Sequence, residues 1–276
     1  WIYRRCDGHD LRIFATTRGD SVKDLELIII GAGPGGIAAA IKAAKAGVSL
    51  KILDENAKPG GRIYGQLNNG FKLINPRFLG ADYKTGKALL AEFDDVREKI
   101  DYRHDALVFG TFENREMAIH QGDTGERLRF NKLILATGAY DRPVPFPGWT
   151  LPGVLTAGGA QTLVKMQRVL PGKRILFAGT GPLQLVVANQ ILDGGGKIEA
   201  ILEAGEINNW LKLLKGFSRN WGLLTDGLQY MRAIRKAGVP LLRKHIILEA
   251  RGDGQVEEAV IAEVDKDWRA IEDTRQ

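Results

Sequence analysis

Cysteine is almost absent from this sequence, and its scarcity excludes several classes of chemistry. Cys6 is the single cysteine among 276 residues. The chain therefore holds no intrachain disulfide, no Cys-X-X-Cys redox pair and no cysteine-rich iron or zinc site. Its four histidines are isolated and show no metal-site spacing, so we expect no bound metal. Any redox chemistry must come from a bound cofactor.

Long apolar runs are also missing, and so are blocks of charged residues of one sign. The apolar run around Leu27 to Ile30 is far too short to span a bilayer, and the first residues do not resemble a secretory signal. We therefore expect a cytoplasmic protein without a membrane span. The 39 Lys and Arg against 33 Asp and Glu give a net charge of +6, and the positive charges are scattered. This argues against nucleic acid as a partner.

What the sequence does contain is a group of glycines directly after that apolar run. The pattern predicts a strand over residues 25–30, a turn over Gly31-Ala32-Gly33-Pro34, a helix over 35–46 and a strand over 49–53. Such a turn holds a pyrophosphate. Gly31 permits the sharp turn, Gly33 lets the backbone approach the phosphates, and Gly36 lets the helix pack on the strand.

A carboxylate stands where a ribose-binding acid is expected. Asp54 follows the second strand, about twenty residues after the glycines, and its neighbour Glu55 can share the role. The alternative for Asp54 is a solvated carboxylate at a strand end. Next, Gly61 allows close backbone approach and Arg62 can meet a phosphate, although Pro-Gly-Gly can also be simply a loop.

The rest of the first half predicts an amphipathic helix over 82–99 and a small antiparallel meander over 105–130. A buried strand over 132–136 then ends in Ala136-Thr137-Gly138, where small residues allow a ligand to lie against the backbone. Four prolines between residues 141 and 153 prevent a regular element and mark the crossover between domains.

The opening pattern then repeats. Thr156 is expected to cap a helix that runs to about Val169. The repeated pattern follows it: a strand over 173–178, the turn Gly179-Thr180-Gly181-Pro182, a helix over 183–192, a strand over 197–202 and the acid Glu203. Gln184 replaces the third glycine, and its side chain should push the helix away or occupy the groove. This copy therefore either binds NAD, with Glu203 repelling a 2′-phosphate, or is an empty fold kept for packing.

The last part predicts helices over 208–215 and 225–236. A strand over 240–250 is expected to pair with one over 256–264 around Gly252-Asp253-Gly254.

Several stretches carry a resemblance to a known family: Gly31-Ala32-Gly33-Pro34-Gly35-Gly36, Leu53-Asp54-Glu55-Asn56, Pro59-Gly60-Gly61-Arg62-Ile63-Tyr64, Leu79-Gly80-Ala81-Asp82-Tyr83, Ala136 to Pro143, Pro147 to Val154, and Gly179-Thr180-Gly181-Pro182-Leu183. On these residues the chain resembles the two-dinucleotide-binding flavoprotein superfamily. It is most similar to the A subunits of bacterial opine oxidases, with subunits of hydrogen cyanide synthase, sarcosine oxidase and L-proline dehydrogenase as relatives.

The resemblance implies FAD at the first turn, although in some relatives this site holds NAD or ATP and the working flavin lies at the junction with another subunit. NAD(H) is the ligand implied for the second turn. The predicted binding residues of the first site are Gly31, Ala32, Gly33, Pro34, Gly36, Asp54, Glu55, Gly61, Arg62, Val108, Ala136, Thr137 and Gly138. Those of the second are Gly179, Gly181, Pro182 and Glu203.

The expected fold class is α/β, with two Rossmann-like dinucleotide-binding domains, the second inserted in the first, and a small antiparallel meander. The expected boundaries are an extension over 1–23, a first domain over 24–148, a second over 149–268 and a tail over 269–276. The C-terminal return to the first domain that such proteins have is missing here, so we expect either a fragment or a shortened subunit that a partner completes.

We expect the dinucleotide-binding subunit of a flavin-dependent amine oxidoreductase complex, acting on an opine or N-alkyl amino acid, with the substrate site in a second subunit. No catalytic residue stands out in this chain. The alternatives are a self-contained NADH-dependent FAD reductase and a structural subunit that binds ATP or NAD without redox chemistry. A disulfide reductase is excluded, because the single cysteine cannot form the redox-active pair.

Overall fold

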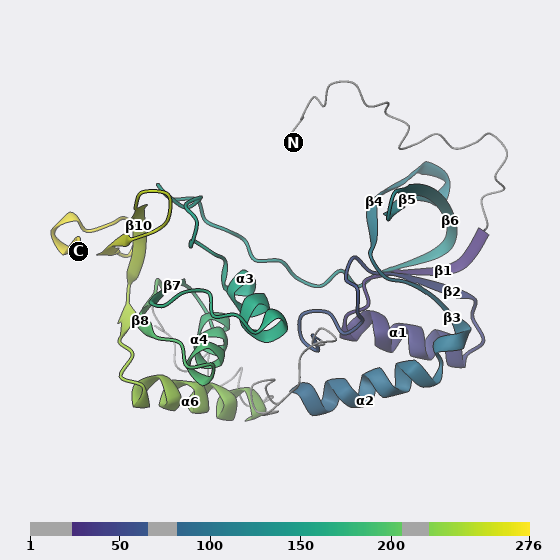
Figure 1. The fold of residues 1–276 in the computed structure, drawn as a ribbon, viewed down its shortest axis with the longest axis horizontal. Helices are drawn as coiled ribbons and strands as arrows, with labels where there is room; N and C mark the ends of the chain where they lie inside the picture. The colour runs from purple at the N-terminus through teal and green to yellow at the C-terminus, as the bar shows by residue number, and fades with distance from the viewer. Residues whose placement is uncertain (1–23, 66–81, 206–220) are drawn as a thin grey trace, which may run out of the picture. The chain divides into compact units, whose positions relative to one another are not determined.

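The computed structural model describes residues 24–65, 82–205 and 221–276, which form two compact units (Figure 1). Unit 1 holds the described residues up to 139, and unit 2 those from 140 onward. The expected extension over 1–23 and the expected helix over 208–215 lie outside the described residues. Of the helices that are described, none has the length and apolar character needed to cross a membrane.

Unit 1 is a mixed α/β structure built on one sheet of six strands. Its strands follow the order β3-β2-β1-β6-β5-β4, in which neighbours among the first four are parallel and β5 pairs antiparallel with β6 and β4. The strands β1 and β2 and the meander are thus where the sequence predicted them, whereas β3 was not predicted. The elements are β1 (Asp24–Ile30), α1 (Pro34–Lys45), β2 (Leu50–Leu53), α2 (Asp82–Asp95), β3 (Ile100–Arg103), β4 (Ala106–Phe112), β5 (Glu116–Gln121) and β6 (Thr124–Leu135).

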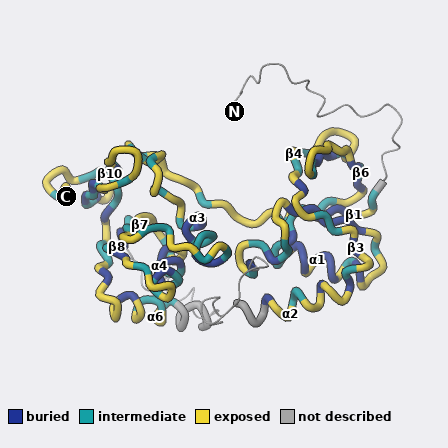
Figure 2. Tube along the Cα trace, viewed as in Figure 1, coloured by how far each residue is buried: buried dark blue, intermediate teal, exposed yellow. Residues whose placement is uncertain are grey.

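Both faces of β1 and β2 are buried over most of their length, as expected for strands inside an α/β sheet. The end of β6 differs, because Ile134 and Leu135 are exposed, so the expectation of a buried strand over 132–136 is wrong in its burial. Leu27 and Ile29 of β1 point into a cluster with α1 and α2, whereas Ile28 packs with the apolar residues of the meander. Figure 1 shows α1 and α2 on one side of these strands and β4 to β6 on the other. In Figure 2 buried positions recur along β1 and α1. This packing fixes the position of the loop between β1 and α1.

One strand is longer than the sequence predicted. The strand expected over 132–136 is the end of β6, a continuous strand of 12 residues. Its first part pairs antiparallel with β5, and its last part pairs parallel with β1, with Leu27 opposite Lys132. Residues 126–135 contain neither glycine nor proline, so one strand serves both the meander and the parallel sheet.

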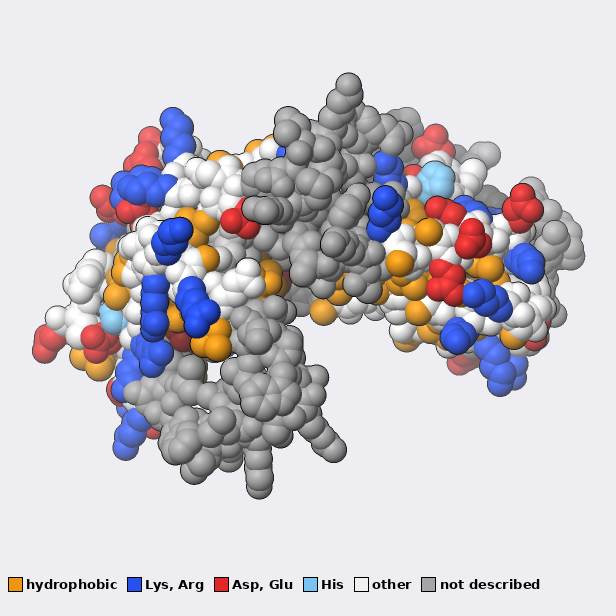
Figure 3. Space-filling model, turned by 90° about the horizontal axis from the view of Figure 1, so that it is seen from below, with side chains coloured by type: hydrophobic (Ala, Val, Ile, Leu, Met, Phe, Trp, Pro, Cys, Tyr) orange, Lys and Arg blue, Asp and Glu red, His pale blue; other side chains and the backbone are white. Residues whose placement is uncertain are grey.

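The outer face of unit 1 carries charges of both signs. In the view of Figure 3, acidic and basic side chains are interspersed over this unit. One such pair joins the two helices, because Lys45 Nζ of α1 lies 2.6 Å from Glu92 Oε1 of α2. The part of unit 1 seen in this view offers no uniform basic surface of the kind that nucleic acid requires.

Unit 2 contains two small sheets. Strands β7, β8 and β9 are parallel, and β10 and β11 form an antiparallel pair. The core of the parallel sheet is formed with α4 and includes Phe177, Val187, Ile191 and Ile201. The elements are α3 (Ala157–Thr162), β7 (Ile175–Gly179), α4 (Leu183–Asp193), β8 (Ile198–Glu203), α6 (Trp221–Lys236), β9 (Leu241–Arg243), β10 (His245–Arg251) and β11 (Glu258–Glu263).

Two predictions for unit 2 are wrong. The strand expected over 240–250 is divided at Lys244, whose φ of 58° is left-handed, so β9 joins β8 while β10 pairs with β11. The helix capped by Thr156 also ends early. The Thr156 hydroxyl does accept a hydrogen bond from Gly159 N, but α3 passes into a π-helical turn over Leu163–Gln167 and stops at Arg168, with φ of 58°.

Candidate nucleotide-binding site

The turn between β1 and α1 is so tightly packed that two of its glycines have no room for a side chain. A Cβ on Gly31, whose φ is 98°, would overlap the carbonyl oxygen of Ala136 at the end of β6. A Cβ on Gly36 would overlap the carbonyl oxygen of Gly31 and lie 3.0 Å from its carbonyl carbon. The first turn of α1 therefore lies directly against the end of β1.

Gly33 is different, because it faces open space. Its φ of −74° and ψ of −178° suit any residue, and no atom of the described residues lies within 4 Å of the position that a Cβ would take. Gly33 is also the N-cap of α1, and no described side chain caps this helix of 12 residues. Its unpaired backbone N–H groups and the helix dipole favour an anion here, so the turn fits a pyrophosphate.

Asp54 lies buried at the end of β2 and holds the glycine turn. Its side chain accepts hydrogen bonds from the backbone N–H of Ala32 and, at 2.7 Å and 2.9 Å, from the backbone N and Nδ2 of Asn56. Its own N–H donates to Arg103 O at 3.0 Å. Because Asp54 is only 5% exposed, the alternative of a solvated strand-end carboxylate is wrong. The neighbouring Glu55 is exposed.

These contacts predict that Asp54→Ala weakens both the fold and the binding of a nucleotide. The substitution leaves the fully buried N–H of Ala32 without its acceptor, which costs about 1–3 kcal/mol of unfolding free energy. A bound ribose would also lose a charge-assisted hydrogen bond of about 1.5–3 kcal/mol.

Asp54→Asn is the matched control, because an amide oxygen can still accept from Ala32. The urea concentration at which the protein unfolds and the amount of co-purified nucleotide should both fall less in Asp54→Asn than in Asp54→Ala. If Asp54→Ala unfolds at the same urea concentration as the unchanged protein, the carboxylate does not hold the turn.

The structure brings two other predicted segments to the same turn. Gly60 N donates to Ala32 O at 2.7 Å, and a Cβ on Gly61 would lie 3.0 Å from Gly33 Cα. The loop of Pro59 to Arg62 therefore packs on the phosphate turn, with Arg62 exposed beside it. Ala136 N donates to Ile30 O at 2.8 Å, which places Ala136 and the following Thr137 and Gly138 beside the end of β1.

Val108 lies farther along the chain from these contacts. It is on β4, two residues after Ala106, whose N–H donates to Asp54 O at 2.9 Å. Its side chain packs against the apolar core of the meander. The structure thus brings the glycine turn, Asp54, the 59–62 loop and residues 136–138 together, and places Val108 in the neighbouring meander.

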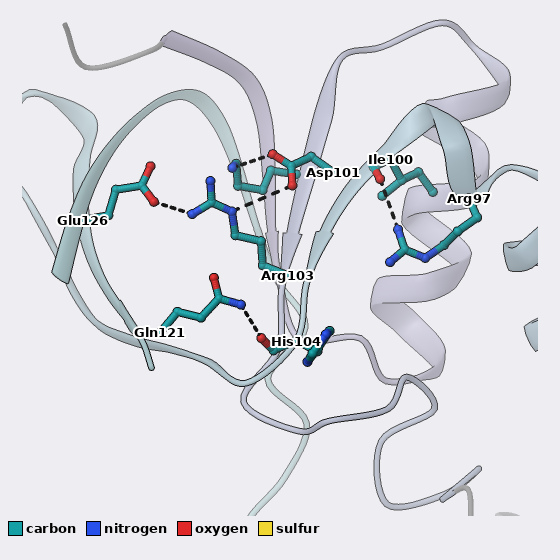
Figure 4. Close-up of polar contacts among 8 residues, drawn as sticks. Arg97, Ile100, Asp101, Arg103, His104, Gln121 and Glu126 are labelled. Carbon is teal, nitrogen blue, oxygen red and sulfur yellow. Dashed lines mark hydrogen bonds and ion pairs between the residues drawn. The ribbon is translucent and has the colours of Figure 1, made fainter. Parts of the chain in front are cut away.

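A polar network lies beside the strand that supports Asp54 (Figure 4). The Arg103 guanidinium lies between the carboxylates of Asp101 and Glu126, and so links β3 to the meander. Lys51 Nζ, which is nearly buried, lies 2.6 Å from Asp101 Oδ2, and Gln121 Nε2 donates to His104 O at 2.7 Å. These pairs hold the end of β3, whose Arg103 carbonyl accepts from Asp54.

The sequence reasoning missed Tyr102, a polar group near this acid. Its Oη is buried and has no hydrogen-bond partner in residues 24–65, 82–205 and 221–276. Burial raises the pKa of Tyr102, and the negative charge of Asp54 raises that pKa further, so the hydroxyl stays protonated. The Arg97 guanidinium lies 4.5 Å from the ring centroid. The sequence signal that could have identified Tyr102 is its position in β3, the strand beside β2.

The second glycine turn is built on the same plan, but the side chain of Gln184 lies beside its first glycine and its acid. Gly179 ends β7 opposite Glu203 of β8, and Gly181 has φ of 94°. Gln184 is 5% exposed, and its Nε2 donates to Glu203 Oε2 at 2.7 Å. Gln184 thus bonds the acid, whereas no described atom lies within 4 Å of the Cβ position of Gly181. Pro182 is the N-cap of α4.

The described residues contain no group of three or more His, Cys, Asp and Glu side chains that could hold a metal ion.

Comparison with known proteins identifies relatives over most of the chain. Residues 25–270 match the family described as pyridine nucleotide-disulphide oxidoreductase. The HcnB subunit of hydrogen cyanide synthase from Pseudomonas aeruginosa is 35% identical over 248 residues, which cover 89% of this chain and 53% of HcnB. The opine oxidase A chain of Rhizobium meliloti is 35% identical over 209 residues, which cover 72% of this chain and 39% of that relative. The chain thus spans about half the length of these relatives or less.

Solved structures share the fold at low sequence identity. L-Proline dehydrogenase from P. horikoshii superimposes with a TM-score of 0.54 at 16% identity, over 91% of this chain and 41% of that one. Thioredoxin reductase of T. acidophilum gives a TM-score of 0.55 at 18% identity, over 87% and 71%. These similarities confirm a mixed α/β fold with a Rossmann-like, largely parallel sheet.

Proposed function

The chain belongs to the pyridine nucleotide-disulphide oxidoreductase family, and on this premise we propose that it is the dinucleotide-binding subunit of a flavin-dependent oxidoreductase complex. The observation that carries the proposal is the first glycine turn. Gly33 and the uncapped N-terminus of α1 face open space, and Asp54 lies directly beneath them, which is the arrangement that an adenine dinucleotide needs.

The names of the relatives support a proposal for the substrate class. Hydrogen cyanide synthase and opine oxidase are the enzymes to which the two relatives belong, and sarcosine oxidase is a third, at 29% identity to its alpha subunit. We propose an opine or N-alkyl amino acid as substrate, bound by a second subunit. Oxidation of the C–N bond of such a substrate, for which FAD would supply the hydride acceptor, would give an imine, and water would then release the amine and a 2-oxo acid.

FAD is the cofactor proposed for the first turn, and when bound it supplies a hydride acceptor. The residues of this chain bind and orient it. The backbone at Gly33 and the N-terminus of α1 hold the pyrophosphate, and Asp54, kept in place by Ala32 and Asn56, accepts from the ribose hydroxyls. The 59–62 loop packs on the turn, and we propose that Arg62 of this loop meets a phosphate.

We further propose that the two units are two Rossmann-like domains of the dinucleotide-binding type, with the second inserted in the first. What supports this is that each unit contains the same succession of parallel strand, glycine turn, helix, strand and acid, ending in Asp54 and in Glu203.

The test is to capture the tagged protein from its source cells and to identify by mass spectrometry both the bound nucleotide and the proteins that co-purify. FAD together with a second oxidoreductase subunit supports the proposal. A colourless protein that releases only ATP or NAD refutes the FAD assignment and supports a structural subunit.

The remaining alternative is distinguished by adding NADH without oxygen. A flavin that is reduced promptly by NADH supports a self-contained NADH-dependent reductase. A flavin that is reduced by an N-alkyl amino acid, and not by NADH, supports the complex.

A further inference from the structure

We propose that Gln184 closes the second glycine turn to dinucleotides, so that this turn has the backbone plan of the first but does not bind the same ligand. The proposal goes beyond the function above and rests on it in one respect, because the redox nucleotide is assigned there to the first turn. It makes Gln184 the residue that determines which of the two turns accepts a ligand.

The two turns are equivalent in backbone register. In unit 1, Ile30 pairs with Leu53, so the next residues along each strand are Gly31 and Asp54. In unit 2, Gly179 pairs directly with Glu203. Each acid therefore lies opposite the first glycine of its turn, where a carboxylate accepts from the ribose of a bound dinucleotide.

The difference between the turns begins at the third glycine position. In unit 1 that residue is Gly36, which packs directly against Gly31, and the first helical hydrogen bond of α1 runs from Ile37 N to Gly33 O at 2.9 Å. In unit 2 the corresponding bond runs from Val186 N to Pro182 O at 3.2 Å, one residue later. The helix therefore starts one residue farther along, as the side chain of Gln184 requires.

That side chain lies across the groove between the ends of β7 and β8. Its Oε1 is 3.8 Å from the position that a Cβ on Gly179 would take, and its Nε2 is 2.7 Å from Glu203 Oε2. The amide nitrogen must face the carboxylate, because the amide oxygen would face it with like charge. The side chain of Gln184 thus lies beside the first glycine, Gly179, and at the same time bonds the acid, Glu203.

Glu203 accepts three hydrogen bonds, as Asp54 does, but one of its donors is a side chain from the helix that follows the turn. Its Oε2 accepts from Gln184 and, at 3.3 Å, from Gly181 N, while Oε1 accepts from Gly205 N at 3.2 Å. A ribose would have to displace a charge-assisted hydrogen bond from a buried amide before it met this carboxylate. In the described part of unit 2, Gln184 Oε1 is itself buried without a partner, so the side chain gains no second bond that a smaller residue would lose.

NADH is the probe that tests the proposal, with binding followed by nicotinamide fluorescence and located by hydrogen–deuterium exchange. In the unchanged protein we expect no NADH-dependent protection of residues 179–186 at about 1 mM NADH, the limit of weak binding. In Gln184→Gly, protection of these residues should appear and affinity should rise at least about tenfold. Gln184→Met keeps the volume of the side chain without its amide, so it should show no gain.

Protection of residues 179–186 by NADH in the unchanged protein overturns the proposal. So does a failure of both Gln184→Gly and Gln184→Ala to gain binding, where Gln184→Ala serves as the second variant because alanine retains the helix propensity that glycine lacks. The nucleotide at the first turn is identified separately by mass spectrometry. If the first turn does not carry FAD, the proposed function is refuted, but the proposal on Gln184 is unaffected. If NADH binds at the second turn of the unchanged protein, the proposal on Gln184 is refuted, but the proposed function is unaffected.

Discussion

Gly36→Ala should lower the free energy of unfolding by about 3 kcal/mol and leave the purified protein without nucleotide. The added Cβ would overlap the carbonyl oxygen of Gly31 and lie 3.0 Å from its carbonyl carbon. Both atoms belong to the backbone of the turn, so neither can rotate away as a flexible side chain would. The helix must move off the strand, and the turn that holds the phosphates moves with it.

Gly35→Ala is the matched control for that result. Gly35 precedes Gly36 in the same helix, but it is exposed, and in the described part of the chain nothing lies within 4 Å of its Cβ position. Alanine there should stabilise α1 by up to about 1 kcal/mol, because glycine is the poorer helix former. Urea unfolding and the nucleotide content of the purified protein measure both effects. Equal behaviour of the two variants would contradict the packing argument.

The sequence was sufficient for the two strand-turn-helix-strand segments because their signals are local. An apolar run that ends in glycine marks the end of β1 and of β7, and the spacing to Asp54 and Glu203 then follows from helix length. The meander was likewise marked by short apolar alternations between turn residues. These elements were predicted to within a few residues of their bounds.

What the sequence could not show depends on contacts between distant residues or on rare backbone states. The division between β9 and β10 falls at Lys244, and lysine carries no preference for the left-handed conformation it adopts there. The burial of Asp54 results from a backbone N–H in the glycine turn and from the strand that follows α2. The hydrogen bond from Gln184 to Glu203 joins residues 19 positions apart, and the sequence left occupation of the groove as one of two outcomes.

Gly33→Ala should leave the fold intact and weaken nucleotide binding by about fivefold to 150-fold. The backbone of Gly33 already has angles that alanine adopts, and its Cβ would enter space that is empty of described atoms. The free energy of unfolding should therefore change by no more than about 0.5 kcal/mol, the usual range for a tolerated substitution. In a bound state the same methyl group meets the pyrophosphate, and overpacking of about 1–3 kcal/mol gives the stated loss of affinity.

The comparison of Gly33→Ala with Gly36→Ala separates the fold from the ligand. If the turn binds phosphate, Gly33→Ala unfolds at the same urea concentration as the unchanged protein but retains less nucleotide, whereas Gly36→Ala loses both stability and nucleotide. If Gly33→Ala keeps its full complement of nucleotide, the open space beside the N-terminus of α1 is not where the phosphates lie. The nucleotide would then have to bind elsewhere, and the first turn would be a structural feature of the fold alone.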